Sequence, residues 1–173
     1  MKLRLLQSQI SHYSDLYSYP QEESELLRMR SAITTAGRLT KDELHLLAKW
    51  KSPRSAGRIE RNSDSFIHEI TSFALAAKDE RARIEVLTVL DGVLWPTASV
   101  ILHIFHADRY PILDYRALWS VSTEVPPQYS FELWWKYVVF CRSVANNANV
   151  GMRTLDRALW QYSKIHQPKE GDA

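Results

Sequence analysis

The segment Leu90-Asp-Gly-Val-Leu-Trp-Pro-Thr-Ala-Ser-Val-Ile-Leu102 carries the pattern on which the fold prediction depends. Apolar residues at helical spacing lead up to it, and Gly92 is suited to a tight turn. Val93 would fill the space between two helices, and Pro96 suits the first turn of the second helix, which we expect to reach about Ala107. The segment therefore predicts two helices joined by a short hairpin.

A second motif, Tyr110-Pro-Ile-Leu-Asp114, follows that helix after a short loop. Aspartate is a preferred N-cap residue, because its carboxylate accepts a hydrogen bond from an amide of the first helical turn. Asp114 is therefore expected to begin a helix that carries Ala117, Leu118 and Val121 on its apolar face.

Capping residues and apolar periodicity predict helices in the rest of the chain as well. Thr40 and Glu43 form a capping box, and Gly37 is suited to end the helix before it. Pro53 and Gly57 are expected to interrupt regular structure. The expected helices cover residues 5–17, 22–35, a stretch after Thr40, 63–77, 80–90, 96–107, a stretch after Asp114, 130–145 and 152–166.

The composition of the 173-residue chain favours an all-α fold. Only five residues are glycine, and Val, Ile and Thr do not gather in alternating runs. We expect a compact bundle of about eight or nine short helices in a single domain over residues 1–166, with a frayed tail over 167–173. Hydrophobic residues make up 45% and charged residues 24%, as in soluble globular proteins.

Cysteine content and apolar runs limit the cofactors and the location. The single cysteine, Cys141, excludes an internal disulfide, an all-cysteine zinc site and an iron–sulfur cluster held within the chain. Cys141 lies among valines and is expected to be an inert core thiol. No stretch approaches the roughly 20 apolar residues of a membrane span, and the N-terminal apolar run is too short for a signal peptide. We expect a cytoplasmic protein that needs no cofactor.

Positive charge is concentrated in one segment. The formal net charge is only +2, so any contact with nucleic acid must use a local cluster. The segment from 49 to 61 holds the densest cluster, with Glu60 as its only acidic residue. Its basic residues are Lys49, Lys51, Arg54, Arg58 and Arg61. Such a cluster can bind phosphates without reading sequence, although a solvated loop is the alternative.

Together the two motifs resemble the helix-hairpin-helix DNA glycosylase superfamily, particularly its adenine-mismatch and endonuclease-III-like branches. In that family the hairpin reads Gly-apolar-Gly-x-x-Thr-Ala, and Pro-x-x-Asp or Pro-Val-Asp follows one helix later. The matching residues here are Gly92, Val93, Thr97, Ala98, Pro111 and Asp114. The separation of 22 positions between Gly92 and Asp114 matches the adenine-mismatch branch. The similarity covers residues 90–119 and, more weakly, extends back to residue 40.

The resemblance implies a DNA-binding enzyme that excises a base, with Asp114 as the catalytic carboxylate. Breaking an N-glycosidic bond passes through a sugar cation like an oxocarbenium ion. Asp114 would stabilise that cation and orient the attacking water. The base would first leave the helical stack and enter a pocket with flat walls. Its candidate walls are Trp95, Tyr115 and Trp119, with Trp134 and Trp135 as further candidates.

The resemblance also implies contacts with the DNA backbone. These would come from Gly92 and Thr97 in the hairpin and from Lys49, Lys51, Arg54 and Arg58 in the basic segment. Arg116 would either contact a phosphate or hold Asp114 through an ion pair. The DNA contacts are expected to have low sequence specificity.

Two departures from the family pattern keep other functions open. Leu94 stands where the family has its second hairpin glycine, and Pro96 lacks an amide donor. The lysine that gives some members lyase activity maps to Pro96 or nearby, so the expected enzyme is monofunctional. One alternative is a non-catalytic helix-hairpin-helix module that binds DNA or a partner. Another is an all-α interaction domain in which Asp114 only caps a helix.

His103 and His106 are three positions apart, a spacing that allows two metal ligands on one helix face, with Asp108 as a third. Ile101, Leu102, Ile104 and Phe105 make the same stretch strongly apolar. We therefore expect the histidines to lie at the margin of a core helix and not to bind a metal.

Overall fold

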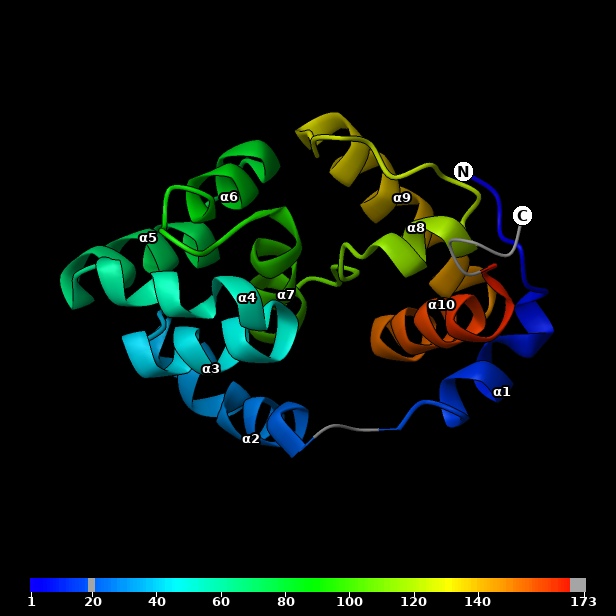
Figure 1. The fold of residues 1–173 in the computed structure, drawn as a ribbon, viewed down its shortest axis with the longest axis horizontal. Coiled ribbons are helices and arrows are strands. Elements are labelled where there is room, and N and C mark those ends of the chain that lie inside the picture. The colour runs from blue at the N-terminus through cyan, green and yellow to red at the C-terminus, as the bar shows by residue number, and fades with distance from the viewer. Residues whose placement is uncertain (19–20, 169–173) are drawn as a thin grey trace. The chain divides into compact units, whose positions relative to one another are not determined.

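The computed structural model describes residues 1–18 and 21–168, and every regular element in these ranges is helical (Figure 1). The all-α prediction is confirmed, with ten α-helices and two short 3-10 helices in the described residues. They are η1 (Gln7–Gln9), α1 (Ile10–Asp15), α2 (Gln21–Ala36), α3 (Lys41–Lys51), α4 (Pro53–Ala56), η2 (Gly57–Arg61), α5 (Asp64–Ala76), α6 (Glu80–Leu87), α7 (Trp95–Phe105), α8 (Tyr115–Ser120), α9 (Phe131–Asn147) and α10 (Met152–His166).

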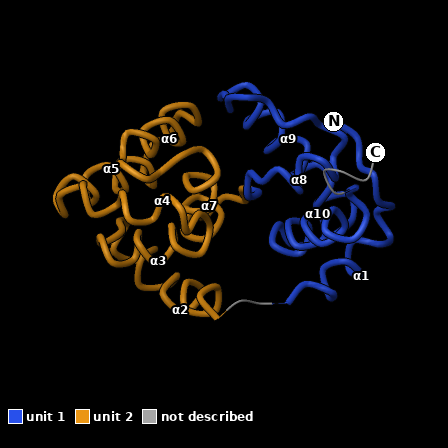
Figure 2. Tube along the Cα trace, in the orientation of Figure 1, with its two compact units in different colours: residues 1–18, 111–173 blue, residues 19–110 orange. Residues whose placement is uncertain are grey.

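The chain packs into two compact units, coloured separately in Figure 2. As far as they are described, unit 1 comprises residues 1–18 and 111–173, and unit 2 comprises residues 19–110. Unit 1 is thus built from both ends of the chain and unit 2 from its middle. The single domain over residues 1–166 stays a prediction. Most of the expected tail, residues 169–173, lies outside the described residues.

Helix α7 forms the centre of unit 2, where it packs against α2, α3 and α6. Eight of its eleven residues are buried, from Thr97 to Leu102 and at Ile104 and Phe105. A helix that is apolar on all sides is stable only when other elements surround it. Its N-cap, Leu94, is 63% exposed. The N-cap of α7 therefore lies at the surface of unit 2, whereas the helix is buried from Thr97 onward.

Helix α10 forms the centre of unit 1, where it packs against α1, α8 and α9. The Ser120 hydroxyl donates a hydrogen bond of 2.6 Å to the Leu159 carbonyl and so ties α8 to α10. The N-terminal residues join α8 through two backbone hydrogen bonds, Lys2 N to Val121 O and Arg4 N to Ser120 O. The start of the chain is thereby held within this unit.

Helix starts agree closely with the capping residues of the sequence. The Thr40 hydroxyl accepts from the Glu43 amide while Glu43 reaches back to the Thr40 amide, so the predicted capping box is confirmed. Gly37 follows α2 with a positive φ of 65°, as a C-terminal glycine should. Side chains cap four further helices; these are Ser63, Asp79, Asp114 and Ser130.

Four features of the helix boundaries differ from the prediction. Gly57 does not interrupt regular structure, because it adopts helical angles (φ −61°, ψ −16°) and leads from α4 into η2. Pro53 begins α4, since the first helical turn needs no amide donor there. Within the expected helix 5–17 only Ile10–Asp15 is α-helical, and α6 ends at Leu87, three residues early. In the described ranges no helix is long and apolar enough to cross a membrane.

Candidate nucleic-acid interface

The turn between α6 and α7 depends on Gly92. Its φ of +87° lies in the left-handed region that favours glycine. A Cβ atom at this position would lie 2.9 Å from the Ser55 carbonyl oxygen and 3.0 Å from Cδ1 of Ile59. Both the turn and its close approach to the segment 55–59 therefore require glycine.

Asn62 holds the same turn through two hydrogen bonds to the backbone of Asp91. Its Nδ2 donates a hydrogen bond of 3.0 Å to the Asp91 carbonyl, and the Asp91 amide donates one of 2.9 Å to its Oδ1. Asn62 is buried, and the two bonds are partly shielded from water. The turn Asp91–Val93 is thus fixed against the end of the basic segment, and Val93 is buried beneath it, as its position predicted.

The basic segment exposes several cations that no carboxylate neutralises. Its single acidic residue, Glu60, lies 2.7 Å from His45 Nδ1. Among the described residues, four of the basic side chains are exposed and form no ion pair. They are Lys49, Arg54, Arg58 and Arg61. Because Gly92 contacts Ser55 and Ile59, these charges and the start of α7 belong to the same region of unit 2.

The start of α7 contains Leu94 and Pro96, the two residues that depart from the hairpin pattern of the DNA glycosylases. Leu94 has a φ of −107°, so its side chain causes no backbone strain where the family has glycine. No side chain caps this helix in the described part of the chain, and Pro96 contributes no amide donor. Thr97 is 1% exposed and packs inside unit 2. Its side chain therefore does not face solvent, whereas the Gly92 turn lies partly exposed.

In unit 1, Asp114 lies at the start of α8 at the end of a firmly held extended segment. Its Oδ1 accepts a hydrogen bond of 2.9 Å from the Arg116 amide, so the predicted N-cap is confirmed. The buried Asp156 accepts one of 3.1 Å from the Ile112 amide, and the Tyr137 hydroxyl donates to the Ile112 carbonyl. The backbone that leads to Asp114 is thereby fixed.

The charge of Asp114 affects two tyrosines nearby. Burial raises the pKa of Tyr129 above its ordinary value, and the Asp114 carboxylate adds to the shift. Burial also raises the pKa of Tyr137, with smaller contributions from Cys141, Asp156 and Asp114. Cys141 is fully buried, and this burial raises the pKa of its thiol well above the ordinary value. The thiol is therefore protonated and lies in the core, as its surroundings predicted.

Arg116 does not hold Asp114 through an ion pair. Its guanidinium lies 5.0 Å from the centre of the Tyr115 ring and 5.5 Å from that of Trp160. Within the described residues it has no carboxylate partner. The guanidinium is therefore oriented by aromatic rings, and its charge is available to a ligand.

The predicted pocket walls do not meet in one described cavity. Trp119 lines a cavity of about 330 Å³ in unit 1, and Asp114 and Tyr115 are not among its lining residues. Tyr115 is 47% exposed, and Trp95 is a half-buried residue of unit 2. Besides Trp119, the cavity in unit 1 is lined by Arg4, Ser122, Thr123, Glu124, Val125 and Gln167. Trp134 is fully buried in the core and Trp135 is half-buried.

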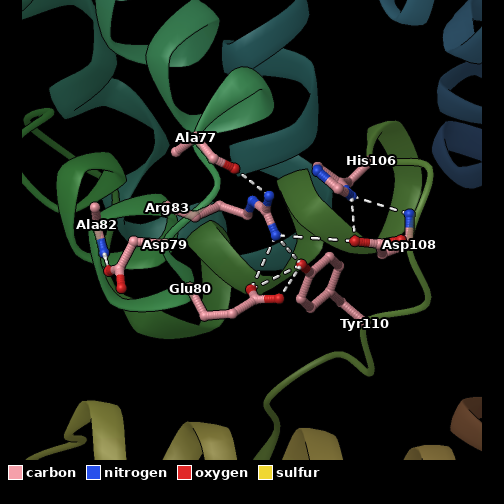
Figure 3. Close-up of polar contacts among 8 residues, drawn as sticks. All are labelled: Ala77, Asp79, Glu80, Ala82, Arg83, His106, Asp108 and Tyr110. Carbon is pink, nitrogen blue, oxygen red and sulfur yellow. Dashed lines mark hydrogen bonds and ion pairs between the residues drawn. The ribbon is translucent and has the colours of Figure 1, made fainter.

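A buried polar network that the sequence did not reveal lies where unit 2 ends (Figure 3). Arg83 donates to Glu80 at 3.0 Å, to the Tyr110 hydroxyl and to the Ala77 carbonyl. The Tyr110 hydroxyl in turn donates to Glu80 at 2.8 Å. The three-residue spacing of Glu80 and Arg83 is the part of the network that a local sequence pattern could have indicated. Tyr110 is 27 positions away from Arg83, so no local pattern predicts its contact. The network fixes Tyr110, the residue before the chain enters unit 1.

His103 of α7 and the C-cap residue His106 both form polar contacts with the loop that follows the helix. His103 Nδ1 lies 2.6 Å from the Tyr110 carbonyl oxygen, and His106 Nδ1 accepts a hydrogen bond from the Asp108 amide. The described ranges contain no group of three or more His, Cys, Asp or Glu residues that could hold a metal ion. The metal alternative therefore has no supporting geometry there.

No protein-family model matches the chain, and comparison with the curated proteins and with the solved structures likewise found no match.

Proposed function

We propose that the protein binds DNA and acts as a monofunctional N-glycosylase, with Asp114 as the carboxylate that supports base release. The observation that carries the proposal is the contact of the Gly92 turn with Ser55 and Ile59. It joins the turn that resembles a helix-hairpin-helix element to the segment richest in exposed positive charge.

The charges of this region suit a phosphodiester backbone. Arg54 and Arg58 are exposed next to the residues that contact Gly92, and neither forms an ion pair in the described chain. Cations that neutralise phosphates release bound counterions, which gives affinity that is independent of sequence and sensitive to salt. The positive end of the α7 dipole adds to this attraction, although Pro96 leaves one amide donor fewer.

Two features of Asp114 support the proposed catalytic role. The carboxylate is half-buried, and its position is fixed by the Arg116 amide and by the anchored segment before it. A carboxylate held in place needs little reorganisation to stabilise positive charge that develops on a sugar. It can also orient the water that completes hydrolysis of the N-glycosidic bond.

The DNA-binding part is tested by titrating a fluorescein-labelled duplex over a range of salt concentrations. In the Arg54→Gln/Arg58→Gln variant we expect weaker binding and a salt slope lower by about 2, one for each lost cation. The matched control is Arg28→Gln/Arg30→Gln, which removes two exposed arginines of α2 in the same unit. Equal losses in the two variants would refute a role for the basic segment.

The catalytic part is tested by base release from duplexes that carry damaged, mismatched or modified bases. Asp114→Asn keeps an N-cap acceptor but removes the negative charge, so we expect base release to be lost while the fold remains. Asp79→Asn is the control, since Asp79 caps α6 in the same way. Equal activity of Asp114→Asn and the wild type would remove Asp114 from the chemistry.

The second candidate function is a non-catalytic module that binds DNA through the same region. It is favoured by Leu94 and Pro96, which replace a flexible residue and an amide donor of the family hairpin. Salt-dependent binding without base release from any of the duplexes would establish this function in place of the enzyme.

A further inference from the structure

The cavity of about 330 Å³ in unit 1 is lined by residues from three parts of the chain. Arg4 comes from the N-terminal segment, and Gln167 is the C-cap of α10. Trp119 of α8 and residues 122–125 after that helix complete the lining. Asp114 is not among the lining residues, so the cavity does not include the proposed catalytic carboxylate. Its volume lies at the lower end of the range of about 300–1,000 Å³ that is typical of small-molecule sites.

The Arg4 side chain is oriented at this cavity by Trp119. Its Nε donates a hydrogen bond of 2.7 Å to the Trp119 carbonyl, and its guanidinium carbon lies 4.4 Å from the centre of the Trp119 ring. The Arg4 amide donates to the Ser120 carbonyl at 2.9 Å, and the Arg4 carbonyl accepts from the Tyr162 hydroxyl at 3.2 Å. Backbone and guanidinium are therefore both held in place, although the side chain is exposed.

The two terminal nitrogens of Arg4 are available to a ligand. Among the described residues Arg4 forms no ion pair, and its single side-chain hydrogen bond uses Nε. The edge that carries both Nη atoms is therefore uncommitted. A guanidinium uses such an edge to bind a carboxylate through two parallel hydrogen bonds.

A carboxylate that lines the same cavity is also uncommitted. Glu124 is exposed and forms no ion pair or hydrogen bond with any described residue. Arg4 and Glu124 thus share one cavity without pairing with each other. Opposite charges arranged in this way attract the anionic and the cationic group of one ligand, whereas a simple anion would be repelled by Glu124.

The turn after α8 fixes the wall that carries Glu124. The Ser122 amide donates to the Trp119 carbonyl and the Thr123 amide to the Leu118 carbonyl, each at 3.0 Å. Val125 follows on the same wall and is 46% exposed. Val125 and the Trp119 ring supply apolar surface to the cavity, which suits the aliphatic part of a small ligand.

We propose that this cavity binds a small amino-acid zwitterion, with its carboxylate on Arg4 and its ammonium group on Glu124. A free amino acid carries both charges and an apolar part within a volume that such a cavity can hold. The inference goes beyond the proposed function and does not depend on it, because it involves neither DNA nor Asp114.

The test is isothermal titration calorimetry of the full chain with two zwitterions, L-leucine and 5-aminopentanoate. Their charges are separated by different distances, so their relative affinities report the spacing that the cavity favours. The reference ligands are 4-methylpentanoate and 3-methylbutylamine, which are leucine without its ammonium group and without its carboxylate. We expect at least one zwitterion to bind about tenfold or more tightly than both reference ligands, since each of these loses one charge-assisted contact.

Two variants assign the two charges. Arg4→Gln should weaken the better zwitterion and 4-methylpentanoate about tenfold and leave 3-methylbutylamine unchanged, whereas Glu124→Gln should weaken the zwitterion and the amine but not the acid. The controls are Lys2→Gln and Asp15→Asn, which remove exposed charges of unit 1 outside the cavity and should leave every affinity unchanged.

Three results would overturn the proposal. One is the absence of binding by both zwitterions in the millimolar range, and another is inorganic phosphate that binds as tightly as the better zwitterion. The third is unchanged zwitterion binding in Glu124→Gln. This variant keeps the test decisive if Arg4→Gln loosens the N-terminal segment, because the exposed Glu124 side chain contributes no contact to the described fold.

Discussion

At the scale of single residues, Gly92 and Gly57 offer a direct comparison. Gly92 has a positive φ and a backbone oxygen where a Cβ would lie, whereas Gly57 is helical with open space around it. Gly92→Ala should therefore lower the free energy of unfolding by about 1–3 kcal/mol, the cost of strained backbone, with the contact at Ser55 adding to it. Urea denaturation followed by circular dichroism measures the change.

Gly57→Ala is the matched control for this substitution. Alanine in a helical position restricts the unfolded chain, so this variant should be more stable by about 0.4–1 kcal/mol. A Gly92→Ala variant as stable as Gly57→Ala would show that the turn can move away from the segment 55–59.

Asp114 can be tested for its structural role apart from any chemistry. Its carboxylate caps α8 through the Arg116 amide. Asp114→Ala should cost about 1 kcal/mol of stability, while Asp114→Asn should cost little because asparagine caps equally well. Thermal unfolding of the two variants measures the difference. A base-release defect in Asp114→Asn at unchanged stability would then be a chemical effect.

At the scale of elements, the sequence predicted helix starts better than helix ends. Thr40, Ser63, Asp79 and Ser130 act on amides two or three residues away, so their signal is local and readable. Gly92 lies close to Ser55, which is 37 positions away in the sequence, and no local sequence pattern predicts such a contact.

Residues 116–119 and residues 157–160 both read Arg-Ala-Leu-Trp, and an aspartate lies shortly before each segment. Asp114 precedes a helix and caps it, whereas Asp156 lies inside α10, where it is buried and pairs with Arg153. Similar residues in similar order therefore take different roles, because the helix starts at a different position relative to the aspartate.

The network around Arg83 is the element-scale feature most open to measurement. Tyr110 is buried and both donates to Glu80 and accepts from Arg83. Tyr110→Phe would leave the buried charge of Arg83 and the half-buried charge of Glu80 with fewer partners, at a cost of about 1–3 kcal/mol. Tyr115→Phe, at an exposed site, should change stability by less than about 0.5 kcal/mol in the same urea titration. Equal effects would mean that the network contributes no net stability.

At the scale of the whole molecule, net charge was a poor guide and charge distribution a better one. A net charge of +2 conceals the exposed basic segment of unit 2 and, in unit 1, the two cations that lie over the Trp160 ring, Arg116 and Lys164. The basic segment was predictable because its cations lie close together in the sequence. The pair at Trp160 was not predictable, since Arg116 and α10 come together only in the folded chain.

The proposed function also predicts that binding and chemistry separate between the units. Arg54→Gln/Arg58→Gln alters charges of unit 2, so it should weaken binding yet leave the single-turnover rate of base release unchanged once DNA is saturated with protein. Asp114→Asn alters unit 1 and should abolish release. It should bind DNA as tightly as the wild type or slightly more tightly, because a negative charge is lost. Quench-flow single-turnover kinetics with parallel anisotropy titrations measure both quantities. A reduced rate at saturation in the arginine variant would mean that these cations also position the reacting nucleotide, and binding and chemistry would then be coupled.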